Sequence, residues 1–190
     1  MAFADLVQAI HPLSEKAIAQ LAEICQEVSF PKGHLLLTHE RIENQLYFIQ
    51  KGIVRAFHAA PNQEVTFWFG QEGDVVLSIQ SYVQQKASYE QIEVLEPTIL
   101  YRLEQAELQL LYENDVELAN WGRKLAEKEW LKAEKRLIDR QCKSASERYE
   151  ELVETQPELL QRVNLGHIAS YLGMTQVSLS RIRAEGRMRF

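Results

Sequence analysis

Leu165-Gly-His-Ile-Ala-Ser-Tyr-Leu-Gly-Met-Thr-Gln-Val-Ser-Leu-Ser-Arg-Ile-Arg183, a stretch near the end of the chain, has the pattern of two short helices joined by a turn. In its first half, apolar residues recur at helical spacing and form one face: Leu165, Ile168, Ala169 and Leu172. Gly173 supplies the permissive backbone with which a helix ends and turns. Thr175 is a good N-cap for a second helix, whose Leu179 and Ile182 point inward. The stretch therefore predicts a helix-turn-helix.

The outward face of the second predicted helix carries amide, hydroxyl and guanidinium groups and one valine. It consists of Gln176, Val177, Ser178, Ser180, Arg181 and Arg183. A helix that enters the major groove of DNA needs such groups and is repelled by acids, and no carboxylate occurs before Glu185. An ordinary helical hairpin is the alternative. We favour DNA binding because the glycine, the cap, the small Ala169 at the crossing and the cationic face coincide.

Side-chain chemistry suggests a role for each residue on this face. Gln176 suits adenine and Arg181 suits guanine, while Val177 can contact a thymine methyl group. Thr175 and Ser178 lie at the positive end of the helix, where we expect them to hold phosphates. The predicted DNA-binding residues are thus Thr175, Gln176, Val177, Ser178, Arg181 and Arg183.

Charge is distributed unevenly along the chain. The formal net charge of −6 over 190 residues argues against a generic binder of polyanions. Residues 1–110 have a net charge of −7, whereas residues 155–190 hold five arginines against two glutamates, a net charge of +3. The positive charge is therefore confined to the segment of the predicted helix-turn-helix, as a localised nucleic-acid interface requires.

Only two cysteines occur, Cys25 and Cys142, and they lie far apart in the sequence. This excludes a disulfide-dense secreted scaffold and an iron–sulfur cluster held by four cysteines. The N-terminus lacks a basic-then-apolar leader, and no apolar run approaches membrane-spanning length. We therefore expect a cytoplasmic protein without a membrane partner. The five histidines show no metal-ligand spacing, so no metal site is expected.

The first half of the chain reads as a β domain preceded by an amphipathic helical segment. Short strand-like runs follow one another and are separated by turn signals such as Pro31-Lys-Gly33 and Pro61-Asn62. This spacing favours a sandwich or barrel-like domain over alternating βα units. The predicted strands are Cys25–Phe30, His34–Thr38, Leu46–Gln50, Ile53–Ala59, Glu64–Phe69, Val75–Ser78, Glu90–Leu95 and Thr98–Leu103.

A long helix is predicted next, from about Glu104 to Asp139, with two adjacent apolar stripes. The first stripe is Leu111, Leu118, Trp121 and Leu125, and the second is Ala126, Trp130, Ala133 and Leu137. One helix needs one apolar face against its own domain, so a second stripe indicates a second partner. We predict a coiled-coil-like homodimer seam through Leu111, Leu118, Trp121 and Leu125. The alternative is one broad stripe packed entirely on the β domain.

The elements combine into an α+β architecture with three parts. Residues 1–110 are the predicted β domain, residues 104–139 the linking and dimerising helix, and residues 140–190 the helical domain with the helix-turn-helix. Within the last part, Ser144-x-x-Glu147 predicts the capped start of a further helix.

The whole length of the chain resembles the CRP/FNR family of bacterial transcriptional regulators. The resemblance rests on Phe30-Pro-Lys-Gly-His-Leu-Leu-Leu37, Leu46-Tyr-Phe-Ile-Gln-Lys-Gly52 with Val54-Arg55, Gly73-Asp74, Ile168-Ala-x-x-Leu-Gly173 and Thr175-x-x-x-Leu-Ser-Arg-Ile182. It implies an antiparallel, cyclic-nucleotide-binding-like sensory β-roll, a long dimerisation helix and a C-terminal winged helix. It also implies a homodimer that binds double-stranded DNA and works with RNA polymerase.

The ligand site departs from the family pattern. In members that bind cyclic nucleotides, a Gly-Glu pair opens the phosphate cassette and an arginine clamps the phosphate through bidentate hydrogen bonds. Gly73-Asp74 is close to that pair, but the position of the arginine falls near Ser88-Tyr89, and the cation available in the cassette is Lys86. We therefore disfavour a cyclic nucleotide and expect another small-molecule effector, or none, at Gly73, Asp74, Lys86, Ser88 and Tyr89.

The end of the chain is the second departure. Family members carry a β-hairpin wing after the recognition helix, and only Ala184–Phe190 follow here, so the wing is short or missing, or the sequence is truncated. No enzyme is expected, because paired nucleophile and base, Walker glycines and a metal triad are absent from the sequence. The competing function is an effector-binding regulatory module without DNA-binding activity.

Overall fold

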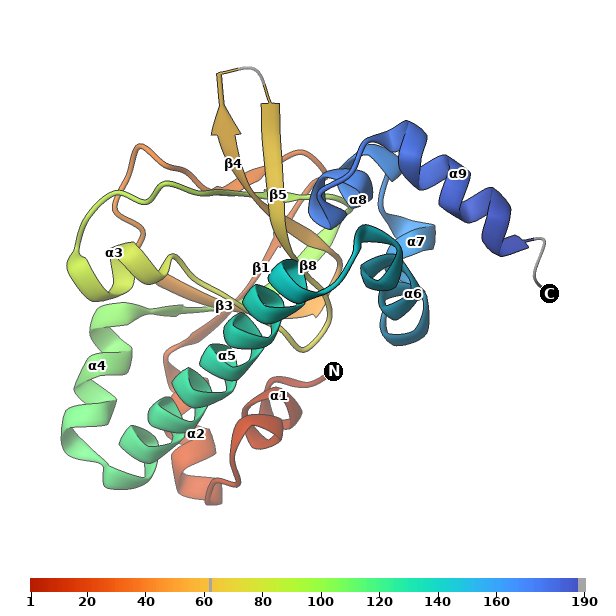
Figure 1. Cartoon of the computed structure of the whole chain (residues 1–190). Coiled ribbons are helices and arrows are strands. Elements are labelled where there is room, and N and C mark those ends of the chain that lie inside the picture. Colours follow the sequence, from red (N-terminus) through yellow and green to blue (C-terminus); the bar gives the residue numbers. More distant parts are fainter. Residues whose placement is uncertain (62, 188–190) are drawn as a thin grey trace. The chain divides into compact units, whose positions relative to one another are not determined.

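The computed structural model describes residues 1–61 and 63–187 (Figure 1). Its internal contacts divide the chain into two compact units. The first consists of Met1–Ala56 and Phe69–Leu131, and the second of Phe57–Trp68 and Lys132–Phe190. The boundary falls inside the long helix, and the tip of one β-hairpin belongs with the C-terminal helices. Neither feature has a signal in the sequence.

The described strands form two four-stranded sheets, and the expected strands are confirmed. One sheet has the order β1-β8-β3-β6 and the other β2-β7-β4-β5, and the paired strands β1–β8, β2–β7, β3–β6 and β3–β8 are antiparallel. The expected antiparallel β-roll is thus confirmed. The strands are β1 Cys25–Phe30, β2 Leu35–Leu37, β3 Gln45–Lys51, β4 Val54–Ala60, β5 Gln63–Gly70, β6 Val75–Val76, β7 Gln91–Val94 and β8 Thr98–Glu104.

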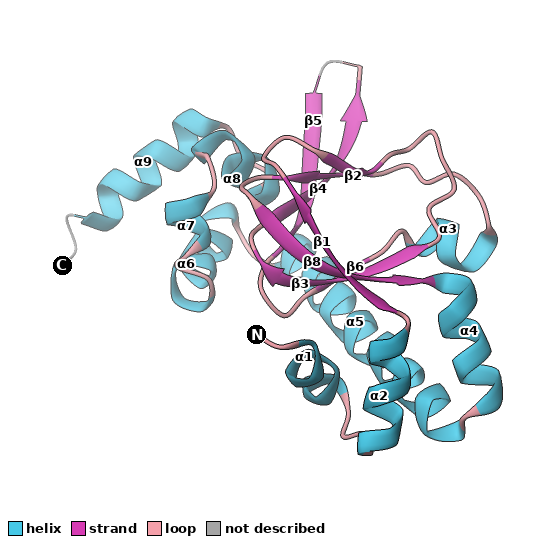
Figure 2. Cartoon of the chain, turned by 180° about the vertical axis from the view of Figure 1, so that it is seen from behind, coloured by secondary structure: helices cyan, strands magenta, loops and turns pink. Residues whose placement is uncertain are grey.

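The first unit also holds four helices and the first part of a fifth, and most of them gather along one side of the β-roll (Figure 2). They are α1 Phe3–Ile10, α2 Glu15–Glu23, α3 Ile79–Gln84, α4 Gln105–Asn114 and α5 Val116–Cys142. Helix α2 begins where expected, because the Ser14 hydroxyl accepts a hydrogen bond from the Ala17 N–H at 3.2 Å. Helix α3 was not predicted. Its six residues are too few for a helical period to be read from the sequence.

The long helix predicted from Glu104 to Asp139 is two helices, α4 and α5. They are separated at Asp115, whose backbone is extended and whose carboxylate accepts a hydrogen bond from the Glu117 N–H at 2.9 Å. A short acidic side chain that captures a nearby backbone N–H competes with helix continuation, which explains the break. Gly122 lets the two helices approach, since a Cβ atom there would lie 2.6 Å from Cζ of Tyr112.

The core of the first unit joins α1, α2, α4 and α5 to the sheet that contains β3 and β8. Leu118, Trp121 and Leu125 of α5 are buried in it. The Trp121 indole N–H donates to the Val7 carbonyl at 2.9 Å, and the Glu117 carboxylate accepts hydrogen bonds from the Ser14 N–H and hydroxyl. The first half of α5 is therefore a structural part of the β-roll unit.

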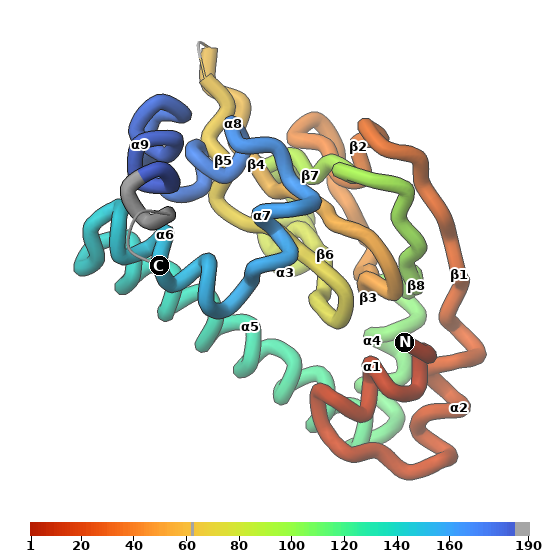
Figure 3. Tube along the Cα trace, turned by 90° about the vertical axis from the view of Figure 1, so that its right-hand side faces the viewer, coloured from red at the N-terminus to blue at the C-terminus, as the bar shows by residue number. Residues whose placement is uncertain are grey.

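The second unit contains the last turns of α5, four further helices and the tip of the β4–β5 hairpin. The helices are α6 Ala145–Thr155, α7 Leu159–Arg162, α8 Leu165–Leu172 and α9 Gln176–Arg187. The Thr66 N–H donates to the Ser170 hydroxyl at 2.9 Å, and this hydroxyl donates to the Glu64 carbonyl at 3.0 Å, so the hairpin tip lies beside α8 (Figure 3). The buried side chains of the helices and of the residue after α7 are Leu152, Leu159, Val163, Ile168, Ala169, Leu172 and Leu179.

Two expectations concern the ends of segments in this unit. The capping box at the start of α6 is confirmed, since Ser144 and Glu147 each accept a hydrogen bond from the backbone N–H of the other. The expected wing would fall on 184–190, where α9 extends to Arg187 and residues 188–190 lie outside the described ranges. Across the described residues, no helix is both long and apolar enough to cross a membrane.

Candidate nucleic-acid interface

The two helices of the predicted helix-turn-helix are present as α8 and α9. Helix α8 ends at Gly173, which has a left-handed backbone with φ of 67°. The N–H groups of Gly173 and Met174 donate to the carbonyls of Ser170 and Ala169, which is the hydrogen-bond pattern of a Schellman motif. Helix α9 then begins with Thr175 as its cap, because the Thr175 hydroxyl accepts a hydrogen bond from the Ser178 N–H at 3.1 Å. The turn therefore forms for the reasons read from the sequence.

The predicted DNA-binding side chains lie on the solvent side of α9. Leu179 is completely buried and fixes the inner face of the helix. Thr175, Gln176, Val177, Ser178 and Arg181 are exposed, and Arg183 is half-buried. Val177 is 62% exposed, which is unusual for an apolar side chain that packs within its own unit. The structure thus brings the predicted set together on one accessible surface.

The N-terminal end of α9 is free of acidic residues in its first turn. Its cap hydroxyls are engaged with each other, since Oγ1 of Thr175 and Oγ of Ser178 lie 2.9 Å apart. Helix α8 has a polar start of its own, where the Asn164 side chain accepts a hydrogen bond from the His167 N–H at 2.8 Å. Asn164 was missed by the sequence reading, although asparagine before a helix is a good cap signal.

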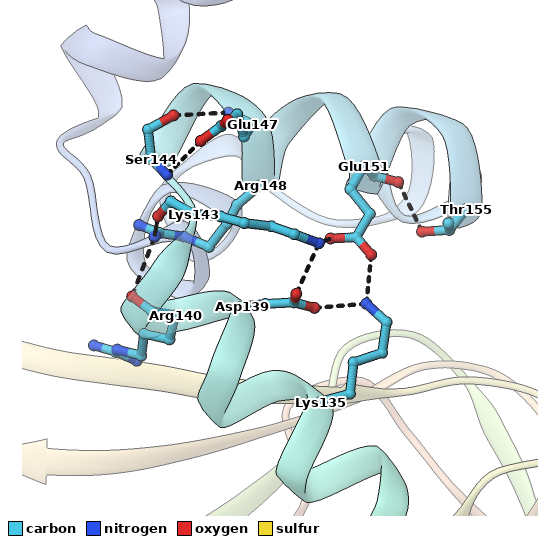
Figure 4. A network of polar contacts seen from close by, with 9 residues as sticks. All are labelled: Lys135, Asp139, Arg140, Lys143, Ser144, Glu147, Arg148, Glu151 and Thr155. Atoms are coloured by element: carbon cyan, nitrogen blue, oxygen red, sulfur yellow. Dashed lines mark hydrogen bonds and ion pairs between the residues drawn. The ribbon is translucent and has the colours of Figure 1, made fainter.

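A charged network connects the end of α5 to α6 (Figure 4). Asp139 and Glu151 each contact both Lys135 and Lys143, with Lys143 Nζ at 2.7 Å from an oxygen of each carboxylate. Hydrogen bonds from the two lysines, with the larger effect from Lys135, hold the pKa of the Asp139 carboxyl and the pKa of the Glu151 carboxyl below their ordinary values. The spacing of Lys135, Asp139 and Lys143 at i, i+4 was a usable sequence signal for part of this network.

The predicted effector residues do not converge on a cationic site. The side chains of Lys86 and Tyr89 are exposed, Gly73 is exposed in a turn, and the Asp74 carboxylate accepts a hydrogen bond from the Gln71 N–H at 3.1 Å. Of the five residues, only Ser88 has a buried side chain. The cassette therefore lacks a buried cation among the residues predicted to line it.

Next to Ser88 lies a buried acid that the sequence reading missed. Glu90 is 9% exposed and hydrogen-bonds the hydroxyls of Ser88 and Ser78. Burial raises the pKa of Glu90, and these two hydrogen bonds oppose the rise. Ser78 is also the N-cap of α3, because its hydroxyl accepts a hydrogen bond from the Ser81 N–H at 3.3 Å. A buried carboxyl at this place favours a neutral or cationic neighbour over a phosphate.

The predicted dimer residues lie inside the first unit. Leu118, Trp121 and Leu125 are core residues, and Leu111 packs against the same core. Leu118, Trp121 and Leu125 are covered by the chain's own first unit, so their assignment to a seam is corrected, while Leu111 is half-buried against the same core. The second stripe is accessible, with Ala126 and Ala133 exposed, Trp130 75% exposed and Leu137 57% exposed. Periodicity distinguished the two stripes of α5, but it wrongly joined Leu111 of α4 to the first stripe. It also did not show which stripe the β-roll covers.

Among the described residues, no group of three His, Cys, Asp or Glu side chains could hold a metal ion. Two candidate functional regions remain from the contacts described above: the outer face of α9 and the region around Glu90.

Known proteins share this architecture. Residues 27–115 match the cyclic nucleotide-binding domain. No curated protein matches the sequence significantly. Among solved structures, FixK2 from Bradyrhizobium japonicum has a TM-score of 0.71 at 19% identity, covering 87% of this chain and 86% of that one. A putative transcriptional regulator of the CRP/FNR family from Eubacterium rectale has a TM-score of 0.71 at 14% identity, covering 93% of this chain and 85% of that one.

A third similar structure is the catabolite activator protein of Thermus thermophilus, with a TM-score of 0.57 at 18% identity, covering 95% of this chain and 86% of that one. These similarities extend over both units and include the β-roll, the long helix and the C-terminal helices. The chain therefore has the fold of the CRP/FNR regulators, with the cyclic nucleotide-binding domain at residues 27–115.

Proposed function

We propose that this protein is a sequence-specific, DNA-binding transcription regulator. The observation that carries the proposal is the outer face of α9, where Gln176 and Arg181 are exposed on a helix that is anchored from behind by Leu179. Amide and guanidinium groups in this presentation match the edges of adenine and guanine in the major groove. The net charge of +3 over residues 155–190 adds attraction to phosphates at the same end of the chain.

The protein acts as a homodimer in this proposal, and the seam is the exposed second stripe. Ala126, Trp130, Ala133 and Leu137 follow one another at spacings of four, three and four residues, which is the a/d pattern of a coiled coil. Leu131 and Ile138, both exposed, widen the apolar surface beside it. Two α9 helices related by the dimer axis would read a pseudo-palindromic site with half-sites about one turn of DNA apart.

The β-roll serves as the regulatory part of the proposed protein, and its effector is not a cyclic nucleotide. The buried Glu90 would place a carboxyl, instead of the guanidinium that a phosphate needs, in the cassette. A different small effector would act by favouring one state of the regulator, which requires unequal affinity for the two states. RNA polymerase in the cytoplasm is the expected downstream partner of such a regulator.

The experiment that tests the proposal is DNA binding by the full chain to a pool of genomic fragments at several salt concentrations. A regulator enriches particular fragments and binds them more tightly than bulk DNA, with affinity that falls as salt rises. An effector-binding module without DNA-binding activity, the competing function, would enrich no fragment at any salt concentration.

A further inference from the structure

The C-terminal ends of two helices meet at one guanidinium group in the second unit. Nη1 of Arg148 donates hydrogen bonds to the carbonyls of Arg140, at 3.4 Å, and Lys143, at the end of α5. Nη2 of the same side chain donates to the carbonyl of Leu172, the last residue of α8, at 2.7 Å. Figure 4 shows the first half of this arrangement, with Arg148 directed from α6 toward the end of α5.

These carbonyls belong to the groups that a helix cannot satisfy internally. The last four carbonyls of an α-helix have no helical partner and carry the negative end of the helix dipole. In α8, the carbonyls of Ala169 and Ser170 are taken by the N–H groups of Met174 and Gly173, while that of Leu172 receives the arginine. Arg148 therefore neutralises the ends of α5 and α8 at the same time.

Arginine is suited to this position by its shape. Its five donors lie in one plane and point in fixed directions, so one side chain can reach carbonyls on two helices. A lysine ammonium is a single point on a flexible stem and would hold one of the two ends. The turn after α8 leaves room for the guanidinium group. Even a Cβ atom at Gly173 would lie 3.6 Å from Nη2 of Arg148, which is an ordinary van der Waals contact.

The helix that carries Arg148 is itself fixed to α5. Its first turn is held by the capping box of Ser144 and Glu147, and its middle is held by Glu151, which contacts Lys135 and Lys143. The Leu152 side chain of the same helix is buried. A displacement at the end of α5 would thus be carried to the Arg148 guanidinium, which lies at the turn before α9.

We propose that Arg148 is a positioning residue for DNA recognition, which ties the turn of the helix-turn-helix to the end of the long helix α5. The inference rests on the proposed function. Leu172, Gly173 and Met174 lead directly into the cap of α9, so the hydrogen bond to Leu172 fixes where the recognition helix starts. In a dimer joined through α5, this link sets the separation of the two recognition helices and hence the spacing of half-sites that the dimer reads.

The first test compares the full chain with its Arg148→Ala and Arg148→Lys variants on a selected two-half-site DNA and on a single half-site. The Arg140→Ala variant is the matched control, because it removes an equal charge from an exposed side chain while its carbonyl remains. We expect Arg148→Ala to weaken binding to the two-half-site DNA about tenfold, the worth of one charge-assisted hydrogen bond. Binding to the single half-site should stay within about twofold, and Arg148→Lys should recover part of the loss.

Equal losses on both DNAs, together with a lower melting temperature, would mean that Arg148 only stabilises the fold, and the proposal would be overturned. Unchanged binding of both variants would overturn it as well. Failure of the unmodified protein to bind any DNA is a different outcome, since it contradicts the proposed function and leaves the link to be judged by a structural measurement.

That measurement is the distance distribution between spin labels at Cys142 and at a cysteine introduced by Ser180→Cys, with Cys25→Ser in the background. Cys142 lies at the end of α5, and Ser180 is exposed on α9. The link predicts a narrow distance distribution when Arg148 is retained and a broad or shifted one in the Arg148→Ala variant. The Arg140→Ala variant should keep the narrow distribution. The same narrow distribution in all three proteins would overturn the positioning role without reference to DNA.

Discussion

Trp121 of α5 donates its indole N–H to the carbonyl of Val7 in α1 at 2.9 Å, across 114 positions of sequence. The ring is completely buried and lies 6.2 Å from the ring of Phe48, centroid to centroid. One side chain thus joins the N-terminal helix, the long helix and the sheet. These contacts fix the first half of α5 to the β-roll unit.

Replacing Trp121 should destabilise the protein strongly. Trp121→Ala is expected to lower the free energy of unfolding by about 3–5 kcal/mol, because a large cavity opens and the Val7 carbonyl loses its donor. Trp121→Phe should cost about 1–3 kcal/mol, chiefly for the unsatisfied carbonyl. Urea unfolding followed by circular dichroism measures both. The exposed Trp130 is the matched control when unfolding is measured on the monomer at low protein concentration. Under that condition, a Trp130→Phe variant as unstable as Trp121→Phe would contradict this assignment.

The second stripe of α5 should control association instead of folding. Trp130→Ala is expected to weaken the homodimer by about 2 kcal/mol or more, as the loss of a central aromatic residue does at other interfaces. Sedimentation equilibrium measures the dissociation constant, and urea unfolding at low concentration checks that the monomer is unaffected. Val153→Ala, which truncates an exposed apolar side chain on α6, serves as the control. A protein that stays monomeric before any substitution would remove the basis for this seam.

Stability should depend on pH through Glu90. Burial raises the pKa of this carboxyl in the folded state, so the folded protein binds its proton more tightly than the unfolded chain does. The contribution of Glu90 to stability is therefore fully present below its ordinary pKa and is lost as the pH rises through the raised one. Glu90→Gln carries no such loss. The difference in melting temperature between the Glu90→Gln variant and the unmodified protein should therefore grow in favour of the variant from pH 4 to pH 7.5. A constant difference would show that Glu90 is charged in the fold.

Much of the fold was readable from the sequence, because local patterns determine it. Period-two runs between turn residues gave the strands, and the Gly173 and Thr175 signals gave the helix-turn-helix. The break at Asp115 was missed, since one aspartate inside a continuous helical pattern resembles an exposed polar residue. Burial by distant segments left no local trace either. Trp121 and Trp130 belong to stripes of similar appearance, and only the tertiary fold shows that α1 covers the first of them.

The candidate functional residues could likewise be predicted only in part. The outer face of α9 follows from helical periodicity and side-chain chemistry, so its residues could be named in advance. The region around Glu90 could not be, because Glu90 lies just before β7 and its character depends on Ser78 and Ser88, which no periodic pattern connects to it. Arg148 was also beyond sequence reading, since its carbonyl partners lie at three different positions of the chain.

The reading of DNA by α9 is tested most directly by Arg181→Ala, with affinities for a selected cognate site and for single-base variants of that site measured by fluorescence anisotropy at fixed salt. Arg123→Ala, on the exposed side of α5, removes an equal charge elsewhere. The account predicts a loss of about 1–3 kcal/mol on the cognate site with relaxed discrimination at one base position, and no change for Arg123→Ala. Undiminished binding and discrimination by Arg181→Ala would contradict it.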